Sequence, residues 1–413
     1  MDLFGGTMEI LKAGPNSKRD LSSAANDSSA TGRGGTVKLQ PQDAQAIPIF
    51  RLHYDQAFRR RFYQECETIF DQGFLSDHTY VRRFERAFAE FAGLPHAVAT
   101  ANGTQALELA LRALEVRGGK VAVPANTFIA TAIAVLNAGA TPLVLDIERE
   151  GLGLDPIELE SALQRERLEA VIVVHIGGVP SPRLPEVVRL CAAFGVPLVE
   201  DCAHAHGARL QGAPVGSFGV AGCFSFHTTK VLTVGEGGMV VTSDAGFHTA
   251  MGSVRRFGMN PELPIEHIRE GSNMKLGEFQ GLLGLLELER GVERLARRRH
   301  LAGLYRRGLE GSAWRLLQSE PLEDGAYYKQ VVLGEIPRAR IEEAFARARI
   351  ALTGGVYYLP LQRQPSLRTC TQGRCYPVSE WFADHHVCPP CYPELEDCEV
   401  QRICEVLLEL DAS

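Results

Sequence analysis

Ala170-Val-Ile-Val-Val-His175 predicts a β-strand. The periodic stretch over 184–194 that follows predicts a helix, and Pro197-Leu-Val-Glu-Asp201 predicts a second strand. Both strand segments are near-continuous apolar runs, which is typical of strands buried on both faces of a parallel sheet. In open sheets of this kind, ligands bind at the carboxyl ends of the strands. The three segments therefore predict an α/β fold with Asp201 at a ligand-binding edge.

The same alternation extends on both sides of this unit. Further strands are expected at 97–100, 121–123, 142–146, 223–226 and 238–242, and helices at 104–114, 127–138 and 156–163. Strands separated by helices in this way predict a mostly parallel, doubly wound sheet. Towards the N-terminus, apolar residues at helical spacing predict helices between Phe50 and Phe91, with a connecting turn at 73–77.

Three domains are predicted along the chain. Residues 1–45 are rich in Gly, Ser, Asn and Asp and are expected to form a disordered arm. Residues 46–290 should form the large α/β domain, and 291–413 a smaller C-terminal α/β domain with a strand at 327–333 and a helix at 341–351. A long helix is expected over 279–300. Its basic second half, Arg294 to His300, could attract anions, and a solvated helix face is the favoured interpretation.

Composition excludes several classes of protein. The 413 residues are 45% hydrophobic and 23% charged, which is typical of a soluble globular protein. A net charge of -7 argues against nucleic acid or an anionic membrane as the main partner. No apolar run approaches the roughly 20 residues of a membrane span, and the N-terminus lacks the apolar core of a signal peptide. Ten cysteines are too few for a disulfide scaffold, so a reduced, cytoplasmic location is expected.

Lys230 follows the apolar segment Cys223-Phe-Ser-Phe226 and precedes Gly235-Glu-Gly-Gly238, so it is presented from a loop. An isolated lysine is usually a surface charge, and an Asp after a strand is often a turn residue or helix cap. Together, however, a lysine that forms a Schiff base and an acid that keeps a pyridine nitrogen protonated are the two side chains that pyridoxal phosphate chemistry requires. We therefore predict that Lys230 and Asp201 hold this cofactor.

A phosphate site is expected where Asn102-Gly103-Thr104 opens a helix. Backbone N–H groups and a hydroxyl at the positive end of a helix bind phosphate, although a Thr there also serves as an ordinary N-cap. Ser225, five residues before Lys230, can add a second hydroxyl. Phe128 can stack on the pyridine ring or belong to the core.

From about residue 46 onward the chain resembles the DegT/StrS sugar aminotransferase family, within the fold type I pyridoxal phosphate enzymes. The motifs that carry the resemblance are Gly73-Phe-Leu-Ser, Phe84-Glu-Arg-Ala-Phe-Ala, Asn102-Gly-Thr-Gln-Ala-Leu107, Pro124-Ala-Asn-Thr-Phe128-Ile-Ala-Thr, Glu200-Asp201-Cys-Ala-His204-Ala-His-Gly207-Ala, Ser225-Phe-His-Thr-Thr-Lys230 and Asn273-Met-Lys-Leu-Gly-Glu278. The family implies a homodimer with two active sites at the subunit interface. It also implies that Asn273 reaches the cofactor phosphate of the other subunit and that His204 contacts the cofactor's phenolic oxygen. From the residues alone, His204 can equally be a buried structural histidine.

The resemblance implies an aminotransferase that moves an amino group from glutamate or glutamine to a keto-sugar, most naturally a nucleotide-linked one, in amino-sugar biosynthesis. Arg255, Arg256 and Lys275, which stands where the family often has Arg, are candidates for binding an anionic part of donor or acceptor. Three alternatives stay open: a keto-cyclitol or other non-nucleotide ketone as acceptor, a pyridoxal phosphate-dependent sugar dehydratase or lyase, and a non-catalytic binding protein. Some relatives that act as dehydratases carry His in place of the lysine, and this chain keeps Lys230.

The C-terminal cysteines allow a second kind of site. The spacing of four cysteines and two neighbouring histidines is compatible with a tetrahedral zinc site. These residues are Cys370, Cys375, Cys388, Cys391, His385 and His386. Free cysteines are more often packing residues, and the resembling family does not require zinc. We therefore expect no metal.

Overall fold

The computed structural model describes residues 45–352 and 354–412. The predicted N-terminal arm lies outside the described residues except for its last position. The described residues belong to one compact unit. Within the described residues the chain forms a large mixed sheet with helices on both faces, and a small antiparallel sheet with helices of its own.

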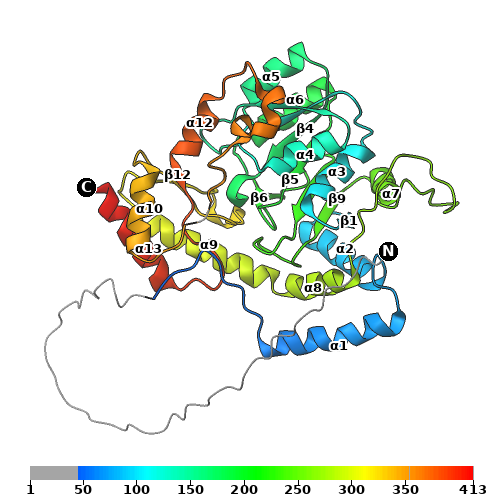
Figure 1. Ribbon diagram of the computed structural model, residues 1–413, viewed down its shortest axis with the longest axis horizontal. Coiled ribbons are helices and arrows are strands. Elements are labelled where there is room, and N and C mark those ends of the chain that lie inside the picture. Colours follow the sequence, from blue (N-terminus) through cyan, green and yellow to red (C-terminus); the bar gives the residue numbers. More distant parts are fainter. Residues whose placement is uncertain (1–44, 353, 413) are drawn as a thin grey trace, which may run out of the picture. The chain divides into compact units, whose positions relative to one another are not determined.

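The large sheet has seven strands in the order β1-β9-β8-β5-β4-β2-β3 (Figure 1). Their bounds are β1 His96–Thr100, β2 Lys120–Pro124, β3 Thr141–Leu145, β4 Leu168–Val174, β5 Leu198–Asp201, β8 Ala221–Ser225 and β9 Gly238–Thr242. Strand β9 runs antiparallel to both of its neighbours, and the other neighbouring pairs are parallel. The predicted mostly parallel sheet is confirmed.

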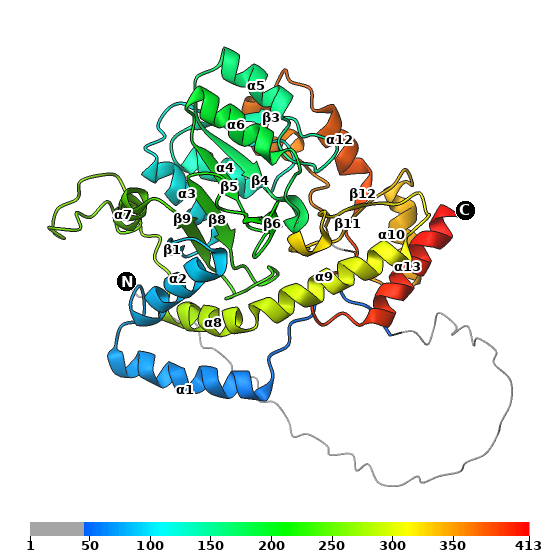
Figure 2. The ribbon, with the colours of Figure 1, turned by 180° about the vertical axis from the view of Figure 1, so that it is seen from behind.

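Alternating side chains of each strand pack against different helices. Val121 and Val123 of β2 share a core with α3, α4 and α7, whereas Ala122 shares one with α5 and α6. This alternation is the period of two that a strand imposes. The bounds are α3 Gly103–Ala113, α4 Ile129–Asn137, α5 Pro156–Arg165, α6 Leu184–Phe194 and α7 Ala245–Val254. Helices α3 and α4 are seen in front of the sheet in Figure 1, and α5 and α6 in Figure 2.

The remaining elements flank this sheet or build the small one. They are α1 Gln56–Gln72, α2 Thr79–Ala92, η1 Ile176–Gly178, β6 Arg209–Leu210, β7 Ala213–Pro214, α8 Glu278–Glu289, α9 Gly291–Gly308, β10 Arg315–Leu317, η2 Leu322–Asp324, β11 Val331–Leu333, α10 Arg338–Arg347, η3 Leu361–Arg363, η4 Pro365–Leu367, α11 Arg368–Thr371, α12 Pro377–Asp384, β12 His386–Val387 and α13 Asp397–Asp411. The strand predicted over 327–333 is wrong in its first half, because only β11 pairs with neighbours. A domain boundary near 291 stays a prediction.

Helices α8 and α9 replace the single long helix expected over 279–300. The chain breaks between them at Arg290, and they run one after the other beneath the sheet in Figure 1. The solvated basic face is wrong for Arg294 and Arg298, which are buried. Arg298 is only 2% exposed, and its guanidinium donates to the carbonyl oxygens of Tyr327 at 3.0 Å and Cys391 at 2.7 Å. The arginine therefore joins α9 to two segments of the C-terminal part of the chain.

Substitution of Arg298 by Met is expected to lower the free energy of unfolding by about 2 kcal/mol, because three buried carbonyl groups, those of Tyr327, Tyr328 and Cys391, lose a hydrogen bond. Arg307→Met is the matched control, since Arg307 lies on the same helix and is exposed. Its effect should stay within about 0.5 kcal/mol. Urea unfolding of both variants measures the difference. Equal losses in the two variants would contradict a structural role for Arg298.

Candidate active site

A cavity of about 740 Å³ lies where the carboxyl ends of β5 and β8 meet the N-terminus of α3. Seven of the residues predicted from the sequence line it: Gly103, Thr104, Phe128, Asp201, His204, Ser225 and Lys230. They come from four separate segments of the chain. The parallel sheet brings these segments to one edge, as expected for an open α/β fold.

The N-terminus of α3 forms one wall of the cavity. The side chain of Asn102 caps the helix by accepting from the backbone N–H of Gln105 at 2.9 Å. Gly103 and Thr104 also line the cavity, and their backbone N–H groups have no acceptor among the described residues. A Cβ atom at Gly103 would lie 2.6 Å from Cβ of Ser225, so only glycine lets the helix start this close to the strand. Free N–H groups beside two hydroxyls suit a phosphate.

Asp201 ends β5 and is 6% exposed. Its carboxylate accepts from Thr131 Oγ1 at 2.8 Å and from the backbone N–H of Ala203 at 3.1 Å. Burial raises the pKa of Asp201, although both hydrogen bonds and the charge of Lys230 oppose that shift. A buried carboxylate without an ion-pair partner gains most from a cation placed beside it. A protonated ring nitrogen would be such a cation.

Lys230 lies in the loop between β8 and β9, and its Nζ atom is 4.5 Å from the centre of the Tyr328 ring. Burial lowers the pKa of Lys230 to about 8, and nearby Lys329 adds to the effect while Asp201 opposes it. A lysine must be neutral to attack an aldehyde, so this shift makes the amine available near neutral pH.

The rate at which the cofactor-free protein combines with pyridoxal phosphate should follow this pKa. Below about pH 8 Lys230 is mostly protonated, so the rate should rise with pH and level off above about 8. A free lysine side chain should keep gaining rate towards its ordinary pKa of 10.5. Stopped-flow absorbance with a lysine peptide as reference measures both profiles. Coincident profiles would show that the fold does not activate this amine.

His204 lies against Tyr328, with ring centres 4.4 Å apart, and its Nε2 atom is 3.2 Å from the hydroxyl of Tyr357. Its Nδ1 atom is buried and has no partner among the described residues. Burial, with the charge of Lys230 secondary, holds the pKa of His204 well below its usual value. Phe128 directly precedes α4 and is 56% exposed, with its ring 5.6 Å from that of Tyr357. An exposed aromatic ring at a cavity is available for stacking.

Four predicted residues are absent from the lining of the cavity: Asn273, Arg255, Arg256 and Lys275. Arg255 is buried and forms ion pairs with Asp77 at 2.8 Å and with Glu85 at 2.5 Å. Arg256 pairs with Asp77 at 2.7 Å. These ion pairs explain the two arginines as structural residues of this region, and a contact between them and substrate stays a prediction.

Among the cavity residues that sequence reasoning did not assign to the site are Thr131, Tyr328 and Tyr357. Thr131 is the hydrogen-bond partner of Asp201, and the two tyrosines come from the C-terminal part of the chain. A single Thr in a helical pattern, such as Thr131, gives no local indication that it bonds to a distant carboxylate. The pair Tyr357-Tyr358 stands between glycines and Pro360, which indicates a loop but not its target.

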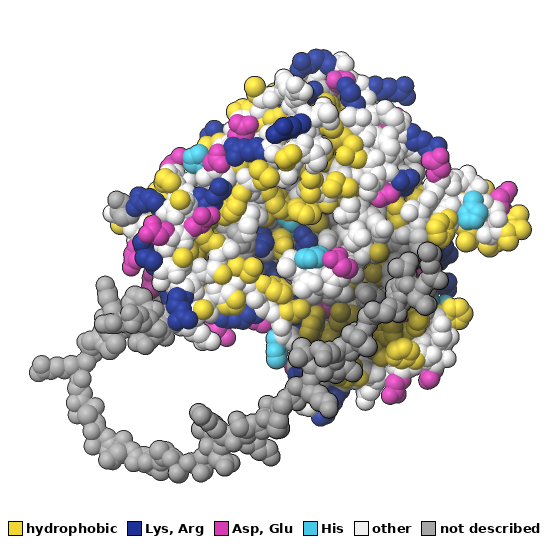
Figure 3. Space-filling view, viewed as in Figure 1, with side chains coloured by type: hydrophobic (Ala, Val, Ile, Leu, Met, Phe, Trp, Pro, Cys, Tyr) yellow, Lys and Arg dark blue, Asp and Glu magenta, His cyan; other side chains and the backbone are white. Residues whose placement is uncertain are grey.

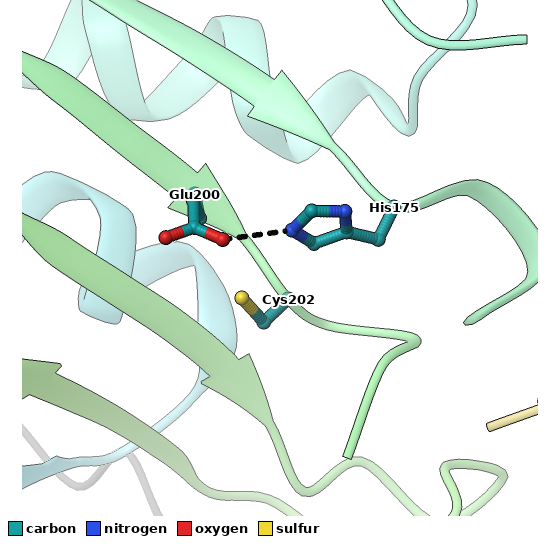
Figure 4. Close-up of side chains that lie close together, drawn as sticks. All are labelled: His175, Glu200 and Cys202. Carbon is teal, nitrogen blue, oxygen red and sulfur yellow. Dashed lines mark hydrogen bonds and ion pairs between the residues drawn. The ribbon is translucent and has the colours of Figure 1, made fainter. Parts of the chain in front are cut away.

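Among the described residues, the metal-ligating side chains that gather closely enough to hold an ion are His175, Glu200 and Cys202. Figure 4 shows His175 and Glu200 pointing towards one another with Cys202 beside them. Glu200 already accepts from His175 Nε2 at 3.1 Å and from three backbone N–H groups, those of residues 216, 218 and 219. The carboxylate therefore anchors a loop next to Asp201. The C-terminal cysteines form no comparable group in the described part of the chain.

The fold and the cavity together define a class of enzyme: pyridoxal phosphate enzymes of fold type I, with a loop lysine and a strand-end acid at the carboxyl edge of the sheet. Residues 56–408 match the model of the DegT/DnrJ/EryC1/StrS aminotransferase family, and the chain belongs to this family. It is a pyridoxal phosphate-dependent aminotransferase, which confirms the predicted family, fold class, activity and cofactor.

Three similar proteins illustrate the range of the family. The chain is 36% identical to a UDP-N-acetyl-3-dehydro-alpha-D-glucosamine 3-aminotransferase of Acidithiobacillus ferrooxidans, over 79% of this chain and 87% of the relative. It is 34% identical to an L-glutamine:2-deoxy-scyllo-inosose aminotransferase of Micromonospora echinospora, over 72% and 74%. The crystal structure of DesV from S. venezuelae is 29% identical and superposes with a TM-score of 0.81, covering 87% of this chain and 96% of DesV.

Proposed function

We propose that this aminotransferase moves an amino group from glutamate or glutamine to the ketone of a nucleotide-linked sugar, in amino-sugar biosynthesis. The observation that carries the proposal is the placement of Lys230 and Asp201 in one cavity of about 740 Å³. That volume lies in the usual range of small-molecule sites. The 36% identity to an enzyme named for a UDP-linked keto-sugar supports the choice of acceptor.

The residues of the cavity divide into five roles. Gly103, Thr104 and Ser225 would hold the phosphate of the cofactor, and Asp201 would pair with its ring nitrogen. Phe128 would stack on the ring, and His204 would donate to its phenolic oxygen. When bound, pyridoxal phosphate supplies an electron sink for the bonds at the donor's α-carbon. Lys230 would bind the cofactor covalently and, once released, carry the proton from that carbon.

The test is a comparison of acceptors. The purified enzyme, with glutamate or glutamine as donor, is offered a UDP-linked 3-keto-N-acetylglucosamine and 2-deoxy-scyllo-inosose, and mass spectrometry detects the aminated product. Amination of the nucleotide-linked sugar at the higher kcat/KM supports the proposal. Amination of the cyclitol alone, or loss of water without consumption of donor, would refute it.

A keto-cyclitol is the second candidate for the acceptor. Relatives named L-glutamine:2-deoxy-scyllo-inosose aminotransferases are 34% to 39% identical to this chain, although the stronger of these values extend over only about half of it. A dehydratase is disfavoured, since the chain keeps Lys230 as the covalent partner of the cofactor.

We also propose a homodimer with the active site at the subunit interface. The loop after α7 projects from the unit and carries hydrophobic side chains at its tip (Figure 3). In this loop Ile265 is 87% exposed, and Phe257, Leu263 and Ile268 are about half exposed. Exposed apolar groups at this density favour burial against a partner. Asn273, at the base of the loop, is also exposed, which fits a contact with a second copy.

Complementation tests the shared site. Lys230→Ala and Asn273→Ala variants are each expected to have little activity alone. If Asn273 serves the other subunit, mixing them after mild unfolding should restore about a quarter of wild-type activity, because half of the dimers are hybrids with one intact site each. Light scattering gives the subunit number. A monomer, or no recovery in the hybrid, would contradict the proposal.

A cytoplasmic location is part of the same proposal. The ten cysteines form no disulfide among the described residues, and six of them are buried. Ten cysteines without a disulfide suit a reducing compartment. Separately, no helix within 45–352 or 354–412 has both the length and the apolar character to cross a membrane.

A further inference from the structure

Tyr328 stands in a segment that is fixed to the chain just after β4, next to the cavity. The backbone N–H of Ala326 donates to the carbonyl oxygen of Gly178 at 2.8 Å, and the backbone N–H of Lys329 donates to that of Gly177 at 3.1 Å. Both glycines belong to η1, which follows β4 after one residue. The backbone of Tyr328 lies between these two hydrogen bonds, and it therefore has a defined place at the edge of the large sheet.

The side chain of Tyr328 contacts two successive residues of the loop between β8 and β9. Its hydroxyl lies 3.0 Å from Oγ1 of Thr229, which directly precedes Lys230. The centre of its ring lies 4.5 Å from Nζ of Lys230. The imidazole of His204 packs on the same ring, with the two ring centres 4.4 Å apart. Tyr328 is 9% exposed and lines the cavity, so it makes these contacts at the place where the amine must be presented.

The loop itself gives the side chain of Lys230 little support. The backbone N–H of Lys230 donates to the carbonyl oxygen of His227 at 2.9 Å, which closes a turn but does not fix the amine. Among the described residues, the structure gives Nζ of Lys230 a place over the Tyr328 ring and no hydrogen bond or ion pair. The position of the amine therefore depends on a residue that is 98 positions away in the sequence.

The ring and its surroundings act on the charge of Lys230 in different directions. A cation over an aromatic face is attracted by the π electrons, so the ring favours the protonated amine. Burial favours the neutral amine and lowers the pKa of Lys230 to about 8, while Asp201 opposes that shift and Lys329 adds to it. The other titratable groups near the amine are His204 and His206 after β5, and His227 and Glu236 of its own loop. A substitution of Tyr328 leaves all of these groups in the chain, so a changed titration of Lys230 would report the ring.

We infer that Tyr328 is a positioning residue for Lys230, whose hydroxyl holds the loop at Thr229 and whose ring supports the amine at the wall of the cavity. This inference rests on the role proposed above for Lys230. It gives the C-terminal part of the chain a function in a site that the large sheet builds. The group that meets the supported amine is an aldehyde carbon, which a lysine attacks efficiently only from a defined place.

The test is the rate at which the cofactor-free, full-length protein combines with pyridoxal phosphate, followed by stopped-flow absorbance from about pH 6 to pH 10. A lysine peptide is measured alongside, so that the titration of the cofactor itself cancels. Tyr328→Phe keeps the ring and removes the hydroxyl. Its rate on the plateau above the midpoint should fall about 3- to 10-fold, the value of one neutral hydrogen bond. The midpoint of its pH profile should stay at about 8.

Tyr328→Leu removes the ring as well as the hydroxyl. The midpoint should then fall by about 0.5 to 1 pH unit, because the protonated amine loses its cation–π contact. General damage to the site has the opposite sign, since water that enters a loosened site would bring the pKa of Lys230 back towards its ordinary value of 10.5. The direction of the change therefore separates support of the amine from a purely structural role.

Two further variants serve as controls. Thr229→Val should slow the reaction by a factor similar to that of Tyr328→Phe, and the double variant should be no slower, because both substitutions break one contact. Tyr376→Phe removes a buried hydroxyl that has no partner among the described residues and lies outside the lining of the cavity. This variant should keep the rate and the midpoint of the wild type.

The outcomes distinguish this inference from the function on which it rests. Failure of the wild-type protein to take up pyridoxal phosphate would overturn both. Normal uptake by the wild type, with a full rate in Tyr328→Phe or a midpoint that does not fall in Tyr328→Leu, would overturn the inference alone. Should Tyr328→Leu prove insoluble, additive losses from Thr229→Val and Tyr328→Phe would have the same meaning.

Discussion

Substitution of Lys230 by Ala is expected to lower turnover by about 10⁴-fold or more and to abolish the visible band of the covalently bound cofactor. Lys230 has two roles in the proposed mechanism: it binds the cofactor covalently, and it moves a proton. Each of these contributes several orders of magnitude in enzymes that use them. Burial lowers its pKa to about 8, and no other lysine lines the cavity among the described residues. Absorbance spectra and steady-state rates measure the two losses.

Lys120→Ala is the matched control for Lys230. Lys120 begins β2, pairs with Glu166 at 2.7 Å and is absent from the lining of the cavity, so its loss should leave spectrum and rate unchanged. Added methylamine should restore part of the activity of Lys230→Ala, because a small amine can enter the space left by the side chain. Substantial turnover without any added amine would refute the catalytic role of Lys230.

Asp201→Asn is expected to lower turnover by about 10³-fold with little effect on folding. The substitution keeps the shape of the side chain but removes the buried charge that would pair with the ring nitrogen. Loss of one electrostatic partner in a water-poor site typically costs two to three orders of magnitude. Rates with saturating cofactor, and the dissociation constant for pyridoxal phosphate, separate poor catalysis from poor binding.

Asp155→Asn provides the comparison for Asp201. Asp155 caps α5 by accepting from the backbone N–H of Ile157 at 2.9 Å, and Asn is an equally good cap. Turnover should therefore be unchanged in Asp155→Asn. Thr131→Val, which removes a donor to the Asp201 carboxylate, should have an intermediate effect of about 10-fold. A full rate in Asp201→Asn would remove the basis for its pairing with the cofactor.

Local patterns were sufficient for the fold class and for much of the candidate site. Apolar runs such as 170–174 report burial on both faces, because every side chain of the strand meets a helix. Asp201 and Lys230 could be singled out since their positions at a strand end and in a glycine-flanked loop are properties of a few neighbouring residues. The structure places both residues in one cavity, and their chemical roles stay proposals.

Contacts between distant segments could not be predicted in this way. Thr131 reaches Asp201 across 70 positions and Tyr357 reaches His204 across 153, and neither pairing has a periodicity to reveal it. The prediction that the arginine run of α9 is solvated was wrong for the same reason. The carbonyl groups that accept from Arg298 lie on segments elsewhere in the chain. Sequence pattern indicates which apolar residues are buried, since that depends on neighbours along the chain. Only the folded chain decides which polar groups meet, because a hydrogen bond depends on distances and angles that packing sets.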